Sequence, residues 1–295
     1  MVAAINIAGD VAGTCSIRHL GSWGFIRVAH GKGIGFEDGT YPYSINDSGE
    51  AAGITADGKS FIYASGAVTT YSIKGAIATA GWSINRSGKI AGYYNDNADV
   101  SHGFVREADG TISKFNDSLA GNGNYQGTLA RAISNQGEIT GYYVDPGGEA
   151  HGFIRTRKNK YTTIDPTGSQ GTLAVSISGV GAVTGEYYSG GASHGFVRSA
   201  EGTITSFDAP DGGEIVYVLS INNDESVVGE YLDVGGIRHG FLRSADGTFT
   251  PIDAPGAGTA PQQGTVATSI NDDGEIAGYF VDSRGTYVGF LRFPR

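Results

Sequence analysis

The chain has 295 residues, of which 49 are glycine and one, Cys15, is cysteine, and its formal net charge at pH 7 is −10. An acidic chain without a lysine or arginine cluster repels nucleic-acid backbones and anionic membranes, so neither is expected as a partner. One cysteine excludes an internal disulfide framework and a cysteine-rich zinc site, and no apolar run is long enough to span a bilayer.

One sequence pattern recurs every 39 to 49 residues and is best seen as SINDDGEIAGYFVDSRGTYVGFLR at 269–292. The residue after its isoleucine marks the repeats at Asn6, Asn46, Asn85, Ser134, Ser178, Asn222 and Asn271. Strand-rich repeats of this length are typical of propeller blades. The pattern predicts an all-β fold, a single seven-bladed β-propeller of four-stranded antiparallel blades. The expected blades are approximately 1–39, 40–78, 79–126, 127–170, 171–214, 215–263 and 264–295.

The strands of a unit are clearest in the sixth repeat. Runs of branched and aromatic residues at 216–222, 227–232, 239–244 and 249–254 predict four strands separated by turn residues. Pro251 would remove a ladder donor, so the fourth strand belongs at a sheet edge and the first is innermost. Long connections such as 116–128 and 253–265 then cross from an outer strand to the next inner strand, on one face of the disc.

The seventh repeat stops after its third strand, which predicts a three-stranded last blade and a ring closed by side-chain packing between the first and last blades. A phenylalanine recurs in the third strand at Phe25, Phe61, Phe104, Phe153, Phe196, Phe241 and Phe290. Large side chains at every period are expected to pack between blades and hold the ring together.

The motifs SINDDGEIAGYF (269–280), HGFLR (239–243) and ADGTFTPIDAPGA (245–257) resemble the HAF-type extracellular repeats of bacteria. This chain carries HGF where the family name implies HAF. The resemblance covers nearly the whole chain and implies propeller-like blades in a secreted or surface protein. The start MVAAINIAGD lacks the basic and apolar segments of a signal peptide, which leaves a cytoplasmic location open.

Four histidines, His102, His151, His194 and His239, precede the recurrent Gly-Phe pair. Packed sheets lie about 10 Å apart, too far for equivalent histidines to share one metal, so structural hydrogen bonds within each blade are expected. No metal and no cofactor is expected, because the chain contains no recognisable motif for either.

Residues that break the repeat are better candidates for a site, because a ligand does not share the symmetry of the ring. After the second-strand glycine, tyrosine is replaced by Glu186 and Glu230 in the fifth and sixth blades. Two nearby carboxylates could form an acid–base pair. The favoured alternative is that each glutamate bonds the histidine of its own blade.

The position two residues before the recurrent isoleucine is expected to line the inner ring, and it varies: Ala3, Tyr43, Trp82, Arg131, Val175, Leu219 and Thr268. With Tyr41 and Tyr217 nearby, an aromatic and cationic inner surface is predicted, where rings stack on a sugar and Arg131 holds a carboxylate. Ordinary packing of a tapered interior explains the same residues. Short loops in the second blade also predict a side opening near Tyr43 and Trp82.

The first blade departs from the others with Cys15, His19 and Trp23. Cys15 and His19 could form a nucleophile pair, although a lone strand cysteine is more often a buried small side chain. Trp23 joins the candidate ligand-binding residues.

Three functions fit this sequence. The first is binding of a carbohydrate or other small polar ligand at the mouth of the central funnel, by Trp82, Tyr41, Tyr43, Arg131, Tyr217 and Trp23. The second is a propeller lyase, hydrolase or isomerase with Glu186, Glu230, His19 and Arg131 as catalytic candidates. The third is a scaffold that binds another protein through its long loops. The oligomeric state is not predicted.

Overall fold

The structure, a computed structural model, describes residues 1–17, 21–29 and 31–294. The strands of the first half are β1 (Val2–Ile5), β2 (Val11–Ile17), β3 (Gly21–Arg27), β4 (Gly33–Asp38), β5 (Thr40–Ile45), β6 (Ala51–Thr55), β7 (Ser60–Ala64), β8 (Ala67–Tyr71), β9 (Ala78–Ile84), β10 (Ile90–Asn95), β11 (Ser101–Arg106), β12 (Ile112–Phe115), β13 (Gly127–Ile133) and β14 (Ile139–Val144). The others are β15 (Ala150–Arg155), β16 (Tyr161–Ile164), β17 (Thr172–Ile177), β18 (Val183–Ser189), β19 (Ala192–Arg198), β20 (Ile204–Phe207), β21 (Glu214–Ile221), β22 (Val227–Leu232), β23 (Arg238–Arg243), β24 (Phe249–Ile252), β25 (Gly264–Ile270), β26 (Ile276–Val281) and β27 (Tyr287–Arg292).

The fold is all-β and built from antiparallel meanders. Three four-stranded sheets contain β1–β4, β5–β8 and β17–β20, an eight-stranded sheet contains β9–β16, and a seven-stranded sheet contains β21–β27. The two larger sheets each join successive meanders through one parallel residue pair, Ser101 with Gly127 and Arg238 with Gly264. The helical content of the described residues is the single 3₁₀ turn Pro210–Gly212.

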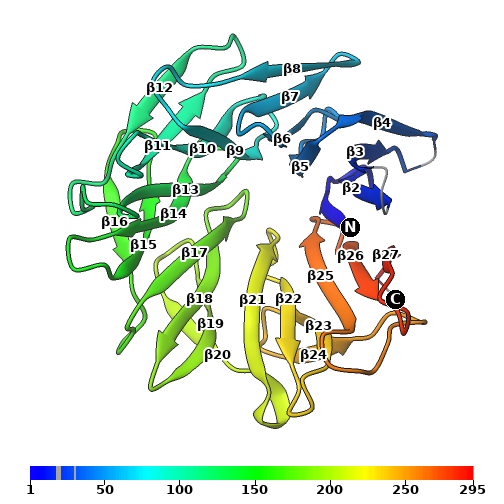
Figure 1. The fold of residues 1–295 in the computed structure, drawn as a ribbon. Coiled ribbons are helices and arrows are strands. Elements are labelled where there is room, and N and C mark those ends of the chain that lie inside the picture. Colours follow the sequence, from blue (N-terminus) through cyan, green and yellow to red (C-terminus); the bar gives the residue numbers. More distant parts are fainter. Residues whose placement is uncertain (18–20, 30, 295) are drawn as a thin grey trace.

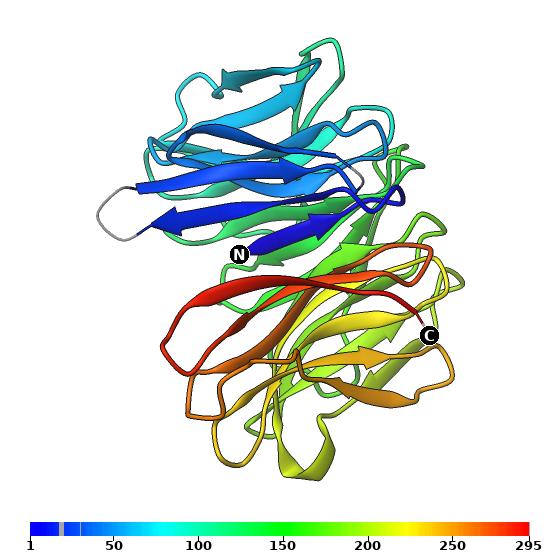
Figure 2. The ribbon, with the colours of Figure 1, turned by 90° about the vertical axis from the view of Figure 1, so that its right-hand side faces the viewer.

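The meanders are arranged around a central axis (Figure 1), with β5, β9, β13, β17, β21 and β25 nearest to it. Figure 2 shows β1 beside the strands of the last meander, and β1 contacts β25 and β26. The predicted strand order is confirmed, and Pro251 lies in β24, which pairs only with β23 in the seven-stranded sheet. The first strand of the sixth repeat, β21, begins at Glu214, two residues before the predicted start at residue 216.

The recurrent phenylalanines form the core between meanders, as predicted. Phe61, Phe104, Phe153, Phe196 and Phe241 are fully buried, whereas Phe25 and Phe290 are half-buried. Phe153 of β15, for example, packs with Val105 and Ala91 from the preceding meander. Burial of each ring contributes about 2–3 kcal/mol before entropy.

Side chains connect the inner strands, whose backbones do not pair with one another. Asn6 Nδ2 donates to the Asn46 carbonyl at 2.9 Å, and Asn46 Nδ2 donates to the Asn85 carbonyl at 3.0 Å. Asn85 continues the series with a 3.0 Å bond to the Ser134 carbonyl. Where the repeat carries asparagine at this position, its side chain therefore links one inner strand to the next around the axis.

Candidate functional site

A cavity of about 370 Å³ lies on the axis, enclosed by the inner strands. Its wall includes Tyr43, Trp82, Arg131, Tyr142, Leu173, Val175, Glu186, Tyr217, Leu219 and Thr268. A second, more polar hollow of about 210 Å³, at the end where the tight hairpins lie, is lined by the asparagine series. The two share Ser44, Ser176, Ser220 and Ser269, so the hollow is continuous along the axis.

A β-bulge aims the variable residues at the axis. In β9, Gly81 pairs with Gly92 and Ser83 pairs with Ala91, which leaves Trp82 as the extra residue. The same register shift singles out Arg131 in β13 and Tyr43 in β5. A bulge re-aims the side chain that it carries. The predicted inner position is therefore the bulge position, and it lines the cavity in six of the seven inner strands, with Ala4 in place of Ala3 in β1.

The recurrent glycine of the second strand makes this bulge sterically possible. A Cβ on Gly92 would lie 2.0 Å from the carbonyl oxygen of Ala80, and one on Gly141 would lie 2.0 Å from that of Leu129. Any side chain there would push the inner strand away. The glycine of the second strand and the bulged residue across from it therefore occur together in successive meanders.

Trp82 is held between side chains from the neighbouring inner strands. Tyr43, from β5, stacks on it with ring centroids 4.4 Å apart and planes 9° apart. The Arg131 guanidinium, from β13, lies 3.7 Å from the Trp82 ring centroid. Tyr93 adds a third stacked ring at 6.2 Å. Trp82 therefore packs against Tyr43 and Arg131 in the wall of the cavity.

Arg131 is the cationic group of the axial cavity. It is half-buried, and among the described residues it forms neither an ion pair nor a side-chain hydrogen bond. Stacking on Trp82 fixes the guanidinium plane, while the N–H donors remain unused. An arginine held in this way is suited to two parallel hydrogen bonds with a carboxylate.

Glu186 is the acidic group of the same cavity and is only 5% exposed. Burial raises the pKa of Glu186 to about 7, although the Val218 N–H, donating to Oε2 at 3.0 Å, and the charge of Arg131 both lower it. Burial also raises the pKa of the Tyr142 hydroxyl, near Arg131 and Glu186. A carboxyl that changes charge near neutral pH, in a cavity with an arginine, is typical of functional sites.

The structure places Glu230 elsewhere. Both of its oxygens accept hydrogen bonds of 2.9 Å from Arg238 Nη1, and Glu230 does not line the axial cavity. Burial raises the pKa of Glu230, and the Arg238 guanidinium opposes that rise. The two glutamates therefore have separate surroundings and do not form an acid–base pair.

The expectation that each glutamate bonds the histidine of its own blade is wrong. His194 Nδ1 pairs with Asp208, and His239 Nδ1 pairs with Asp253 at 2.8 Å. Glu186 instead reaches the backbone of the next meander, because its strand position faces the inter-sheet space. The histidines do form the structural hydrogen bonds predicted within their own meanders. Among the described residues, no three His, Cys, Asp or Glu side chains are grouped to hold a metal.

Tyr217 and Tyr41 fall near the site in different ways. Tyr217, 52% exposed, lines the cavity. Tyr41 is half-buried on β5. Burial is the main cause that raises the pKa of Tyr43, and the charge of nearby Tyr41 raises it further. A further hollow of about 380 Å³, lined by Gly58, Tyr93, Tyr43 and Trp82, lies where the short second-blade loops predict a side opening.

The first-blade candidates do not join this site. Trp23 lies on β3 opposite Cys15 on β2, away from the inner strands, and does not line the axial cavity. Cys15 is exposed, so the expectation of a buried cysteine is also wrong. His19 lies outside the described residues.

Tyr142 is the cavity residue that sequence reasoning missed. It follows the second-strand glycine, at the position of Glu186 and Glu230 in other repeats, and its signal was the same alternation that drew attention to those glutamates.

No family model matches the chain, and no curated protein matches its sequence. Solved structures do resemble it in fold. A streptogramin B lyase structure has a TM-score of 0.60 at 13% identity, covering 97% of this chain and 94% of that one. The BP39L lectin from Burkholderia pseudomallei has a TM-score of 0.56 at 11% identity, covering 96% of both chains. The Aleuria aurantia lectin, in complex with Fucα1-6GlcNAc, has a TM-score of 0.51 at 11% identity, covering 88% and 94%. The chain therefore shares an all-β, propeller-like fold with lectins and a lyase of unlike sequence.

Proposed function

We propose that the axial cavity binds a small polar ligand that carries a carboxylate, with acidic carbohydrates as the class that fits best. The observation that carries this proposal is Arg131: a guanidinium fixed on Trp82, facing the cavity, without an ion-pair partner among the described residues. Charge-assisted hydrogen bonds of this kind contribute about 1.5–3 kcal/mol each. Tyr217, Tyr142 and Glu186 supply the hydroxyl and carboxyl groups that select the rest of the ligand.

The cavity is of suitable size and composition for such a ligand. Its volume of about 370 Å³ falls in the range of small-molecule sites, and its wall combines apolar Leu173, Val175 and Leu219 with a few polar groups. Apolar carbons of a sugar ring would contact the aliphatic wall, while hydroxyl groups reach the tyrosines.

Calorimetric titration with paired sugars tests this proposal. Glucuronate, galacturonate and N-acetylneuraminate are compared with glucose, galactose and N-acetylmannosamine. At least one acid is expected to bind more than tenfold more tightly than its neutral counterpart, and Arg131→Gln to remove that preference. Arg284→Gln is the control, because Arg284 is 82% exposed in a loop and pairs with Asp282. Equal binding of acids and neutral sugars, or no binding by any of them, would overturn the proposal.

The same cavity supports a second function, acid–base catalysis on the bound ligand, in place of simple binding. The observation that favours it is Glu186, whose pKa of about 7 allows it to donate and accept a proton near neutral pH. NMR of a bound acid incubated with the protein would reveal conversion. In an enzyme, Glu186→Gln abolishes conversion and leaves binding within a few-fold; an unchanged conversion rate contradicts this role.

The finer architecture belongs to the same proposal. We propose that the meanders form a seven-bladed propeller whose last blade, β25–β27, has three strands. The register shift that repeats in every inner strand supports one rotational unit per meander. We also propose that the chain belongs with HAF-type repeats and functions outside the cytoplasm, which cell fractionation would test.

A further inference from the structure

One outer-strand side chain fills the space between each meander and the next. It lies beside the residue that precedes the recurrent phenylalanine of its own third strand. We call these six residues the junction side chains: Phe36, Tyr71, Phe115, Ile164, Phe207 and Ile252. All are aromatic or branched apolar residues.

Each junction side chain packs against the third strand of the following meander. Phe207 lies 5.9 Å from the Phe241 ring in a T-shaped arrangement, and Arg243 lies 5.2 Å from the Phe207 ring. Tyr71 repeats this arrangement with Phe104 at 6.3 Å and Arg106 at 5.1 Å. In these two junctions the third-strand phenylalanine and arginine both contact the outer-strand ring, and at Phe36 the place of the arginine is taken by Tyr63, with ring centroids 4.9 Å apart.

The glycine before the recurrent phenylalanine lies next to the junction side chain of its own meander. An added Cβ on Gly103 would lie 2.3 Å from Phe115, and one on Gly195 would lie 2.2 Å from Phe207. The ring of the junction side chain therefore lies directly on the glycine of its own meander. We call the space that the junction side chain fills the socket. It is bounded by this glycine on one side and by the third-strand phenylalanine of the following meander on the other.

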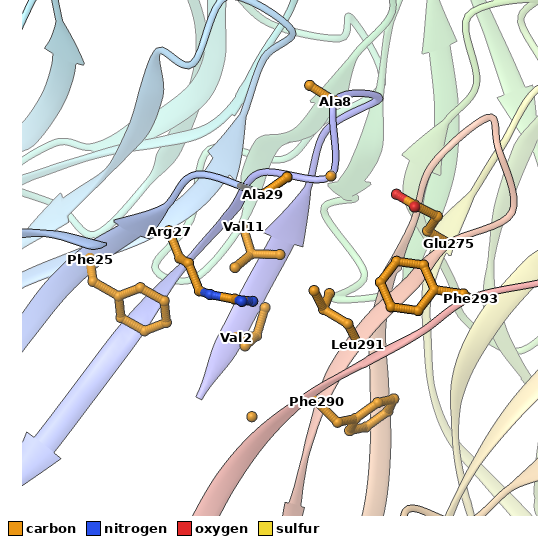
Figure 3. A pocket seen from close by; sticks show the side chains of 12 residues that line it. Val2, Ala8, Val11, Phe25, Arg27, Ala29, Glu275, Phe290, Leu291 and Phe293 are labelled. Carbon is orange, nitrogen blue, oxygen red and sulfur yellow. The ribbon is translucent and has the colours of Figure 1, made fainter. Parts of the chain in front are cut away.

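The socket between the last and first meanders has no occupant among the described residues. An added Cβ on Gly289 would meet only Val2 Cγ2 closely, at 2.9 Å. A cavity of about 430 Å³ lies there, lined by Gly289 and Phe290 from β27 and by Phe25 and Arg27 from β3. Figure 3 shows Phe25 and Arg27 on one side of this cavity, with Phe290 and Leu291 opposite.

The strand beside this socket is also unpaired on its outer side. Within residues 1–17, 21–29 and 31–294, β27 pairs only with β26. Its Tyr287 is 57% exposed, and Phe293, just beyond the strand, is 61% exposed. The open edge offers backbone donors and acceptors to an added strand.

We propose that this edge and socket bind an extended peptide that lies outside residues 1–294, which adds a strand to β27 and inserts an aromatic side chain between Gly289 and Phe25. Four of the six junction side chains are aromatic, so we expect the occupant to be a short antiparallel strand that carries one ring, as in ITSF of β20. Arg27 then covers the ring as Arg243 covers Phe207. Backbone pairing sets the direction of the peptide, and the socket sets its register.

The test uses a fluorescent peptide with the sequence of residues 201–209, EGTITSFDA, and the same peptide with alanine in place of Phe207. Anisotropy titration against the full chain is expected to show saturable binding of the first peptide and at least tenfold weaker binding of the second. Gly289→Leu, which fills the socket, should lower the affinity at least tenfold with an unchanged circular dichroism spectrum.

The peptide comparison uses the unmodified protein, so it holds even if Gly289→Leu does not fold. No binding of either peptide, or equal binding of both, would overturn the proposal. So would a dimer in sedimentation equilibrium that excludes the peptide, since β27 would then pair with a second copy. Because this socket is remote from Arg131, its failure would leave the axial-site proposal untouched.

Discussion

Asn271 Nδ2 donates a 2.9 Å hydrogen bond to the backbone carbonyl of Asn6, across 265 positions of sequence. Nearby, Ser269 Oγ accepts from the Ile5 N–H at 3.3 Å, and Thr268 Oγ1 donates to the Val2 carbonyl at 3.2 Å. Side chains thus close the gap between the last inner strand, β25, and the first, β1.

Replacing Asn271 by serine should weaken this closure. Ser134 shows that serine can retain the local turn, because its Oγ accepts the Glu138 N–H at 3.1 Å. Serine cannot reach the Asn6 carbonyl, so this hydrogen bond is lost while the carbonyl keeps the Gly9 N–H at 3.1 Å, and the expected cost is about 0.5–1.5 kcal/mol. Urea unfolding should show Asn271→Ser less stable than wild type, and Asn271→Ala less stable still. A serine variant with wild-type stability would contradict this role.

Glu186 makes stability depend on pH. Burial raises its pKa from 4.5 to about 7, so the folded state keeps a proton that the unfolded chain releases between those values. The free energy of unfolding therefore falls as pH rises through this window, by about 3 kcal/mol in total. Glu186→Gln removes the titration and can still accept the Val218 N–H.

Urea titrations at pH 5 and pH 8 measure this effect. The advantage of Glu186→Gln over wild type should grow by about 2–3 kcal/mol between the two pH values. Asp282→Asn is the control, since hydrogen bonds from Thr286 and Arg284 lower the pKa of that surface carboxylate out of this range. A pH-independent difference for Glu186→Gln would show that Glu186 titrates normally.

The phenylalanines of the repeat should contribute unequally. Phe153 is fully buried between two meanders, so Phe153→Ala should cost about 3–5 kcal/mol. Phe290 lies half-buried beside the unoccupied socket, and Phe290→Ala should cost less than half as much. Thermal unfolding of the two variants makes the comparison; equal losses would mean that the socket is closed in solution.

Arg131 should not be replaceable by lysine. Lysine keeps the charge but offers neither the planar fork that binds a carboxylate nor the flat surface that stacks on Trp82. Arg131→Lys should weaken binding of an acidic ligand about tenfold, with less than 1 kcal/mol change in the free energy of unfolding. Calorimetry checks the first value and urea unfolding the second. If Arg131→Lys bound the acidic ligand as tightly as the wild type does, Arg131 would act through its charge alone.

The residues that line the axial cavity could be predicted because they differ from one repeat to the next, whereas their neighbours in the sequence recur. Tyr43, Trp82 and Arg131 vary at a position whose neighbours recur, and the structure brings all three into one wall. Their orientation was less accessible, because strand alternation alone cannot reveal a bulge. The recurrent second-strand glycine, such as Gly92 opposite Trp82, was its signature.

The partners of the glutamates could not be read from the repeat. Glu186 and Glu230 occupy equivalent positions, yet one contacts the backbone of Val218 and the other contacts Arg238. The difference arises from non-repeating residues on adjacent strands, which a pattern within one unit does not contain. Trp23 was misplaced for a related reason: its residue type suggested a binding role, but β3 lies away from the axis.

The most direct test of the account is a crystal structure of the protein grown with the tightest-binding acidic sugar. The account predicts density for the ligand in the axial cavity, with its carboxylate within hydrogen-bonding distance of the Arg131 guanidinium. Ligand density elsewhere on the sheets, with only solvent beside Arg131, would contradict it.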